Sequence, residues 1–170
     1  ILPVRSFGFE EVLPRTNRLG GGGRVGACAA YALECQGIAS DIQIIDANAE
    51  AAEGEALDLL HGAAVLGGQR VFTGCYKRAA DSDVFVITAG LRRKPDESRL
   101  DLVNRNVALF RQILASIRDG GYKKGAIVLV VSNPVDILTY IAARELDLPE
   151  GQAIGLGTML DSSRFRSLIA

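Results

Sequence analysis

The sequence predicts an α/β domain in which helices cover both faces of a parallel sheet, a doubly wound fold. Apolar runs of strand length alternate along the chain with segments of helical periodicity, which is the pattern of such sheets. A G-x-G-x-x-G spacing at Gly21, Gly23 and Gly26 stands at the start of the first helical segment. A buried-strand pattern over 41–46 ends in Asp46, about 20 residues after that turn.

The glycine turn and Asp46 share one chemical interpretation, a dinucleotide site. Glycine has no Cβ, so the backbone can approach a phosphate closely, and the helix that follows points free N–H groups at an anion. An acid at the end of the next strand can accept hydrogen bonds from ribose hydroxyls. A glycine-rich turn alone can equally be a flexible loop without a ligand, and it is the paired acid that favours the dinucleotide.

Residues 1–19 depart from this pattern. A buried apolar strand should lead directly into the glycine turn, but the stretch from Pro14 to Leu19 holds a proline and several polar side chains. The apolar stretches Ile1–Val4 and Val12–Leu13 lie too far from the turn to fill the role simply. Either the segment is unrelated in origin, for example through a reading-frame error, or a strand of unusual polar content forms. The local mismatch favours the first interpretation.

The elements after the turn follow in order. A helix is expected over 25–36, because Gly37 is a typical helix-stop residue, and a strand over 41–46. Asn48 can cap a helix that runs to Leu60. The apolar positions at helical spacing in that helix, which we expect to face inward, are Leu57, Leu60 and Ala64.

The rest of the chain continues the alternation. We expect a short strand over 69–73, a continuous apolar strand over 83–88 and a long amphipathic helix over 101–118. The inward positions of this helix are Leu102, Val103, Val107, Phe110, Ile113, Leu114 and Ile117. The remaining elements are a strand over 126–131, a helix over 135–146 with Pro134 at its entrance, a strand over 153–156 and a helix over 161–169.

The bulk composition narrows the function classes. A net charge of −1 over 170 residues gives no reason to expect a nucleic-acid or membrane surface, and no apolar run reaches the roughly 18 residues of a membrane span. Cys28, Cys35 and Cys75 are scattered, which favours a reducing compartment over a disulfide framework or a zinc site. Because the N-terminus also lacks a signal-peptide pattern, we expect a cytoplasmic protein without a bound metal.

Three strand ends carry polar residues that should meet at the same edge of the sheet as the glycine turn. The arginine-rich loop over 91–99 is either a solvated surface loop or a lid that brings cations to an anionic substrate. Asn133 either caps the next helix or donates to a substrate oxygen. Asp161 and Arg164 share a helix face. They form an ordinary surface ion pair, or Arg164 binds a substrate carboxylate while Asp161 orients a histidine.

A series of motifs runs through the chain in one order: Gly23–Gly26, Ile44–Asn48, Ala56–Leu59 with His61 and Gly62, Thr88–Gly90, Glu97–Val103 with Asn106, Ser132–Thr139 and Leu160–Arg166. Together they resemble the lactate/malate dehydrogenase family over residues 20–170. The resemblance implies a Rossmann-type NAD-binding domain over 20–156 and the start of a truncated substrate domain over 157–170. Residues 1–19 remain an atypical segment.

The resemblance implies a role for each matched position of the cofactor site. Gly21, Gly23, Val25 and Gly26 would hold the pyrophosphate of NAD. Asp46 would bind the adenosine ribose and favour NAD over NADP. The other implied cofactor contacts are Tyr76, Gly90, Leu91, Arg92, Val131 and Asn133.

The same resemblance implies roles toward a small 2-oxo or 2-hydroxy acid. Arg99 would polarise the substrate carbonyl, Arg164 would bind its carboxylate, and Asp161 would pair with the catalytic histidine. Asn133 would lie near both nicotinamide and substrate. Arg166 matches a position that some bacterial lactate enzymes use for activation by a sugar phosphate. The intact enzyme would be a homo-oligomer, a dimer or a tetramer.

Arg93 falls at the position where lactate enzymes usually carry glutamine and malate enzymes carry arginine. A cation there would pair with the second carboxylate of oxaloacetate, and it would lack a partner beside the methyl group of pyruvate. The stretch 97–103 resembles the lactate branch instead. The side-chain argument favours malate and oxaloacetate, and lactate and pyruvate are the alternative.

The family's catalytic histidine has no counterpart in these 170 residues. The single histidine, His61, precedes Gly62 near a helix end, where the resemblance implies a structural role. The sequence therefore predicts an NAD-dependent oxidoreductase acting on a CH–OH group, of which this chain holds the first half and is itself inactive. A non-catalytic NAD-binding fragment is the alternative from another class, and sequence beyond Ala170 would distinguish the two.

Overall fold

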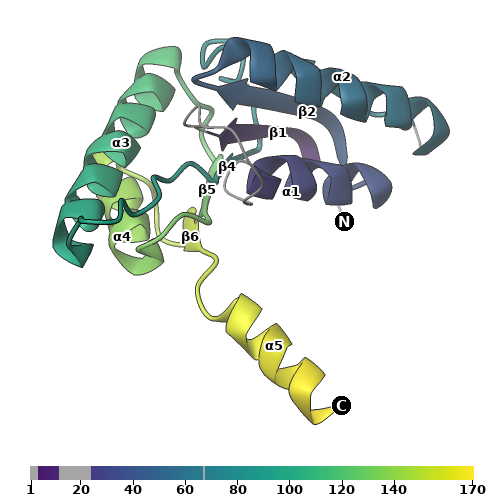
Figure 1. Cartoon of the computed structure of the whole chain (residues 1–170). Coiled ribbons are helices and arrows are strands. Elements are labelled where there is room, and N and C mark those ends of the chain that lie inside the picture. The colour runs from purple at the N-terminus through teal and green to yellow at the C-terminus, as the bar shows by residue number, and fades with distance from the viewer. Residues whose placement is uncertain (1–3, 12–23, 67) are drawn as a thin grey trace.

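The computed structural model describes residues 4–11, 24–66 and 68–170, and within them the chain forms a six-stranded parallel sheet (Figure 1). The spatial order of the strands is β3-β2-β1-β4-β5-β6, so the chain winds outward from β1 in both directions. The strands are β1 (Val4–Glu11), β2 (Ala39–Asp46), β3 (Arg70–Thr73), β4 (Val84–Ile87), β5 (Ile127–Val130) and β6 (Ala153–Gly155). This is the doubly wound fold that the sequence predicts.

Two pairs of helices cover the two faces of the sheet, α1 with α2 on one face and α3 with α4 on the other (Figure 1). Each face has its own apolar cluster, one around Ile42 and Ala30 and the other around Phe110 and Leu138. The helices are α1 (Arg24–Cys35), α2 (Ala49–Leu66), α3 (Arg99–Gly120), α4 (Val135–Glu145) and α5 (Met159–Ile169). No helix within the described ranges is long and apolar enough to cross a membrane.

The central strand comes from the segment that the sequence pattern leaves unexplained. β1 lies between β2 and β4, and Phe7 is in register with Ile42 on one side and Val84 on the other. Residues 4–11 thus form a strand of polar content, as the second interpretation of this segment expects, whereas the origin of residues 1–19 stays a prediction. β1 holds charged and polar residues among its apolar ones, so no continuous apolar run marks it in the sequence. The polar stretch 14–19 lies outside the described residues.

The predicted helices and strands after the glycine turn are confirmed, with ends that shift by a few residues. The largest shift is in α2, which continues to Leu66 instead of ending at Leu60. Asn48 caps this helix as predicted, because its Oδ1 accepts a hydrogen bond from the Ala51 amide at 3.2 Å. Ser98 caps α3 in the same way, since its Oγ accepts from the Asp101 amide at 3.1 Å.

The predicted inward face of α2 is wrong. Leu57 and Leu60 are 46% and 42% exposed, and Ala64 is exposed as well. The side chains that α2 buries against the sheet and α1 are Ala52, Ala56, Leu59 and Ala63. Apolar residues occur on more than one side of this segment, so periodicity allows two inward faces. The face with small alanines is the one that lets the helix lie close to the sheet.

α1 carries a buried acid on its contact with α2. The Glu34 side chain is 0% exposed, and neither carboxylate oxygen has a hydrogen-bond partner among the residues that the structure describes. It faces α2 at Gly62, where an added Cβ would lie 3.9 Å from both oxygens. Burial raises the pKa of Glu34, because removal from water disfavours the charged carboxylate.

Replacing Glu34 by Met should stabilise the domain. Burying a polar group without a hydrogen bond costs about 1–3 kcal/mol, so the free energy of unfolding at pH 7 should rise by that order. In the folded state, Glu34 stays protonated at pH values above its unfolded pKa of about 4.3. The wild-type stability should therefore fall as pH rises from the unfolded pKa to the raised folded one, and the Met variant should lose that slope.

Denaturant titrations at several pH values measure both effects. Glu34→Gln removes the charge but keeps an unpaired polar group, so it should flatten the pH dependence with a smaller gain in stability. Glu53→Gln removes an exposed acid from α2 and is the matched control. Equal stability of the Met variant and the wild type at pH 7 would show that Glu34 is compensated in solution.

Candidate functional site

The carboxyl ends of the parallel strands collect the predicted site segments at one edge of the sheet. α1 begins at this edge with Arg24, and no acidic side chain stands in its first turn. No carboxylate of the same helix therefore competes for its free N–H groups, and these can bind an anion. Within the glycine turn, Gly21 and Gly23 lie outside the described residues, whereas Val25 is exposed and Gly26 is buried inside α1.

Asp46 ends β2 and is held there by the turn that follows. Its Oδ1 accepts a hydrogen bond from the Asn48 amide at 2.6 Å. Asp46 is in register with Glu11, the last residue of β1, so its backbone lies beside the end of the central strand. Amide donors at the start of α1 and a carboxylate acceptor at the end of β2 are the groups that a pyrophosphate and a ribose require. The residues therefore fit NAD.

Tyr76 lies in the connection between β3 and β4, half-buried beneath α3. Gln43 Nε2 donates to the Cys75 carbonyl at 3.0 Å, and a Cβ on Gly120 would lie 2.7 Å from the Tyr76 carbonyl carbon. Only glycine at position 120 permits this approach. Gly120 ends α3 whereas Arg99 begins it, so Tyr76 packs at the opposite end of that helix. Its contact with a cofactor stays a prediction.

The loop Leu91–Ser98, which we call the lid, is fixed to α3 at its first residue. Asn106 of α3 is 6% exposed. Its Oδ1 accepts from the Leu91 amide at 2.7 Å, and its Nδ2 donates to the Leu91 carbonyl at 3.5 Å. An amide side chain can satisfy both backbone groups at once, so Asn106 sets where the lid leaves the strand end beside Gly90.

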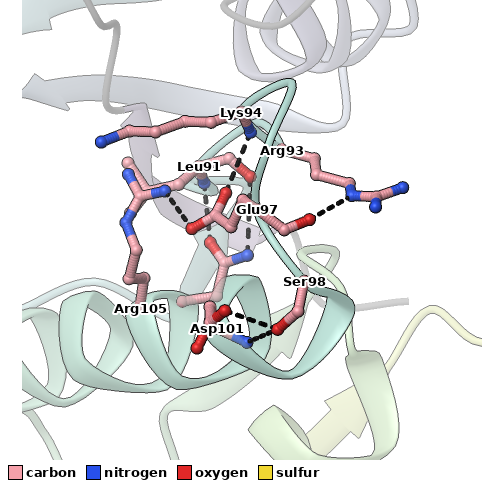
Figure 2. Close-up of polar contacts among 8 residues, drawn as sticks. Leu91, Arg93, Lys94, Glu97, Ser98, Asp101 and Arg105 are labelled. Atoms are coloured by element: carbon pink, nitrogen blue, oxygen red, sulfur yellow. Dashed lines mark hydrogen bonds and ion pairs between the residues drawn. The ribbon is translucent and has the colours of Figure 1, made fainter.

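Glu97 is the centre of the lid (Figure 2). Its Oε1 accepts from Arg105 Nη1 at 2.6 Å, its Oε2 from the Lys94 amide at 2.9 Å, and its carbonyl from Arg93 Nε at 2.8 Å. The Glu97 side chain is only 8% exposed. The hydrogen bond from Arg105, and after it the one from the Lys94 amide, lower the pKa of Glu97.

The lid presents its cationic side chains to solvent. Arg92, Arg93 and Lys94 are exposed, and so is Arg99 at the first position of α3. Apart from the bond to the Glu97 carbonyl, the guanidinium of Arg93 has no acceptor among the residues that the structure describes. Exposure suits a solvated loop as well as an open lid, so both interpretations of this segment remain.

Ser132 connects the ends of two neighbouring strands, a role that the sequence pattern does not reveal. Its buried Oγ donates to the Ala89 carbonyl at 2.5 Å and lies 3.2 Å from the Ile87 carbonyl. The bond places Asn133, which is exposed, and Val131, which is half-buried, at the same edge as the lid. The helix that follows has Pro134 at its N-cap position, so Asn133 is not the cap.

Asp161 and Arg164 form the surface ion pair that was one of their two interpretations. Arg164 Nη1 lies 3.2 Å from Asp161 Oδ1, and the two side chains are 66% and 71% exposed. α5 buries none of its residues and extends away from the sheet (Figure 1). The roles of Asp161 and Arg164 toward a substrate stay predictions, and so does the role of Arg166.

His61 does not join this edge, because it lies in the second half of α2, away from the end of the helix that follows Asp46, where its side chain is exposed. Within the described part of the chain, no three His, Cys, Asp or Glu side chains gather in a group that could hold a metal ion.

Comparison with known proteins gives this geometry a family. Residues 17–155 match the family model described as "lactate/malate dehydrogenase, NAD binding domain". The chain belongs to this family. The matched region contains the whole candidate cofactor site, from the glycine turn to Asn133, and it makes NAD the cofactor of the domain. The resemblance noted from the sequence motifs is thus confirmed.

Among the relatives of this chain are bacterial L-lactate dehydrogenases. The chain is 47% identical over 150 residues to L-lactate dehydrogenase 1 of Clostridium acetobutylicum, covering 88% of this chain and 47% of that protein. It is 43% identical over 162 residues to the L-lactate dehydrogenase of Priestia megaterium, covering 94% of this chain and 50% of that protein. The chain thus spans about half the length of the relatives that it matches.

Solved structures agree with the sequence comparison. The minor L-lactate dehydrogenase of Enterococcus mundtii, in its ligands-bound form, superposes with a TM-score of 0.86 at 40% identity, over 99% of this chain and 50% of that one. MGS-M5, a lactate dehydrogenase from a Medee basin deep-sea metagenome library, superposes with a TM-score of 0.84 at 36% identity. The match covers 98% of this chain and 50% of that one. The doubly wound fold, with β1 at its centre, is therefore the fold of these enzymes.

Proposed function

We propose that this chain is the cofactor-binding half of an NAD-dependent L-2-hydroxy acid dehydrogenase. The observation that carries the proposal is the meeting, at one sheet edge, of the α1 amino terminus, Asp46 and a cationic lid. The first two suit a dinucleotide, and the lid suits an anionic substrate. Bound NAD would supply the acceptor for the hydride that leaves the substrate carbon.

The chain's own residues would bind the substrate and steady its charges. Arg164 would take the carboxylate in a two-pronged hydrogen bond, and Arg99 would stabilise the developing charge on the substrate oxygen. Asn133 would donate a hydrogen bond at the same place. Asp161 would hold the proton-exchanging histidine supplied by the second half of such an enzyme, which requires breaking its present bond to Arg164.

Lactate and pyruvate are the substrate pair that we propose first. The relatives at 43–47% identity are named L-lactate dehydrogenases, which supports lactate more than malate. Malate and oxaloacetate, which the side-chain argument from Arg93 favours, remain the second candidate. That argument needs a lid that closes over the substrate and removes Arg93 from water. In this structure the Arg93 side chain is exposed, where a charge pair contributes little.

Domain division and assembly belong to the same proposal. We place the end of the NAD-binding domain at residue 156 and the start of a substrate domain at 157, because α5 buries no side chain in the sheet domain. A homo-oligomer is supported by the exposed Leu57 and Leu60 on α2, which a second copy could cover.

A purified polypeptide of these residues should bind NADH but show no turnover with pyruvate or oxaloacetate. Loss of a general acid–base alone typically lowers a rate by about 10²–10⁴-fold, and much of the substrate pocket would be missing as well. Fluorescence titration measures NADH binding, and the loss of NADH absorbance with added pyruvate or oxaloacetate measures turnover. Fusion to the second half of the Clostridium acetobutylicum enzyme should restore activity. Failure to bind NADH contradicts the proposal, and turnover without the second half contradicts the assigned need for its histidine.

A further inference from the structure

The lid has one nearly buried carboxylate, and that carboxylate connects its main chain to a helix. We propose that Glu97, held by Arg105, is a positioning residue that sets the orientation of Arg93. The inference rests on the proposed function only in taking Arg93 as the cation that faces the substrate. We call Glu97 and Arg105 the latch.

The first step of the argument is the bond between α3 and the lid. Arg105 belongs to a 22-residue helix that packs on the sheet, so its backbone is a fixed reference. Its Nη1 lies 2.6 Å from Glu97 Oε1, across eight positions of sequence. A charge-assisted bond is stronger than a neutral one, and the Glu97 side chain that accepts it is only 8% exposed. The side chain of Glu97 is therefore fixed relative to α3.

The second step is the turn that Glu97 closes within the lid. Its other carboxylate oxygen, Oε2, accepts from the Lys94 amide at 2.9 Å, and its own amide donates to the Lys94 carbonyl at 3.2 Å. Side chain and main chain of Glu97 thus bind the same residue from two directions. Fixing the carboxylate fixes the backbone between positions 94 and 97, including the Glu97 carbonyl.

The third step runs from that carbonyl to Arg93. Arg93 Nε donates to the Glu97 carbonyl at 2.8 Å (Figure 2). A guanidinium is planar, so fixing Nε and its covalent bond to the rest of the Arg93 side chain defines the plane of the group. The two terminal nitrogens remain side by side for an anion such as a carboxylate. Arg105 therefore acts on Arg93 through Glu97 without touching it.

Lys94 of the lid and the cap pair Ser98 and Asp101 lie next to the latch. Arg105 from α3 and Lys94 from the lid are the cations that lower the pKa of Glu97. Ser98 and Asp101 bond to each other at the helix cap, with Ser98 Oγ 2.5 Å from Asp101 Oδ2. The latch and the cap are thus separate networks, and a change in one need not undo the other.

Nuclear magnetic resonance of the whole 170-residue chain tests the latch directly. The Lys94 amide, bonded to Glu97 Oε2, reports the ionisation of that carboxylate, and the Arg93 Nε–H reports the last step. In the wild type the Lys94 amide signal should titrate below the usual glutamate range. In Arg105→Met this midpoint should rise toward that range, and hydrogen exchange at Arg93 Nε should accelerate about tenfold in Arg105→Met and Glu97→Gln.

Two further variants separate positioning from general stability. Arg105→Lys keeps a cation and should restore part of the protection at Arg93. Arg111, which is also on α3, forms an ion pair with Glu145 of α4, with 2.7 Å between Arg111 Nε and Glu145 Oε1. Glu145→Gln breaks this pair and is the matched control, which should leave the lid signals unchanged. Should Arg105→Met fail to fold, the comparison of Arg105→Lys with Glu145→Gln decides the question.

Unchanged exchange at Arg93 Nε in both latch variants would overturn the proposal. NADH titration of the same samples keeps this outcome distinct from failure of the proposed function. A chain that shows the exchange changes but does not bind NADH retains the latch and loses the dehydrogenase assignment. A chain that binds NADH with unchanged exchange retains the assignment and loses the latch.

Discussion

Replacing Arg93 by Gln should shift the substrate preference toward pyruvate by about 10²–10³-fold, measured as the ratio of kcat/KM for pyruvate to that for oxaloacetate. In a closed site, the guanidinium gains a charge-assisted partner from the second carboxylate of oxaloacetate. With pyruvate the same cation is desolvated beside a methyl group. Glutamine removes both effects, and they change the ratio in the same direction.

The measurement requires a complete enzyme in which residues 1–170 precede the second half of a lactate dehydrogenase. Lys94→Gln is the matched control, because it removes the neighbouring exposed cation of the lid, and it should change the ratio by less than about threefold. A ratio that Arg93→Gln leaves unchanged would show that Arg93 stays in solvent during catalysis. The parent enzyme's own ratio decides between the two proposed substrate pairs.

Replacing Asp46 by Asn should reduce the preference of the chain for NADH over NADPH by about tenfold or more. The Asp46 carboxylate should repel the additional phosphate of NADPH, and two like charges about 4 Å apart repel each other by about 1 kcal/mol in water and about 4 kcal/mol near a protein surface. Asn keeps an oxygen that can accept from the Asn48 amide, so the turn after β2 should survive. Ser at this position would test charge and turn together.

Fluorescence titrations with the two reduced cofactors measure the preference on the 170-residue chain itself. Raising the salt concentration should narrow the preference of the wild type and have less effect on Asp46→Asn, because only the charged residue is screened. Asp58→Asn, which removes an exposed acid from α2, is the control. Equal affinity of the unmodified chain for NADH and NADPH would contradict the role of Asp46.

Much of the fold could be predicted because its signals are local. Alternating apolar runs give the strands and helices, and Asn48 and Gly37 stand at the helix ends where their chemistry predicts them. The inward face of α2 could not be predicted in the same way. Leu57 and Ala56 are neighbours in an apolar segment, and only contact with the sheet decides that alanine is buried and leucine exposed.

The candidate site divides along the same line. Asp46 and the lid arginines could be proposed from their places after strands, since parallel strands bring their carboxyl ends together. The groups that hold these residues were not proposed, because their partners are distant in sequence. Ser132 bonds to Ala89 across 43 positions and Asn106 to Leu91 across 15, and neither pair follows a local period.

The sequence by itself determined the doubly wound order of elements and the family, because both follow from local patterns and motifs, whereas the positions proposed to bind NAD and a 2-oxo acid stay predictions. The tertiary structure decided which segment fills the centre of the sheet, because β1 is defined by hydrogen bonding to two neighbours and not by its own polar composition. It also decided that Glu34 is buried with no hydrogen-bond partner among the described residues, and that each carboxylate oxygen of Glu97 accepts a hydrogen bond. Both residues are glutamates, and they differ in bonding because Glu34 packs against Gly62 of α2 whereas Glu97 lies beside Arg105 of α3.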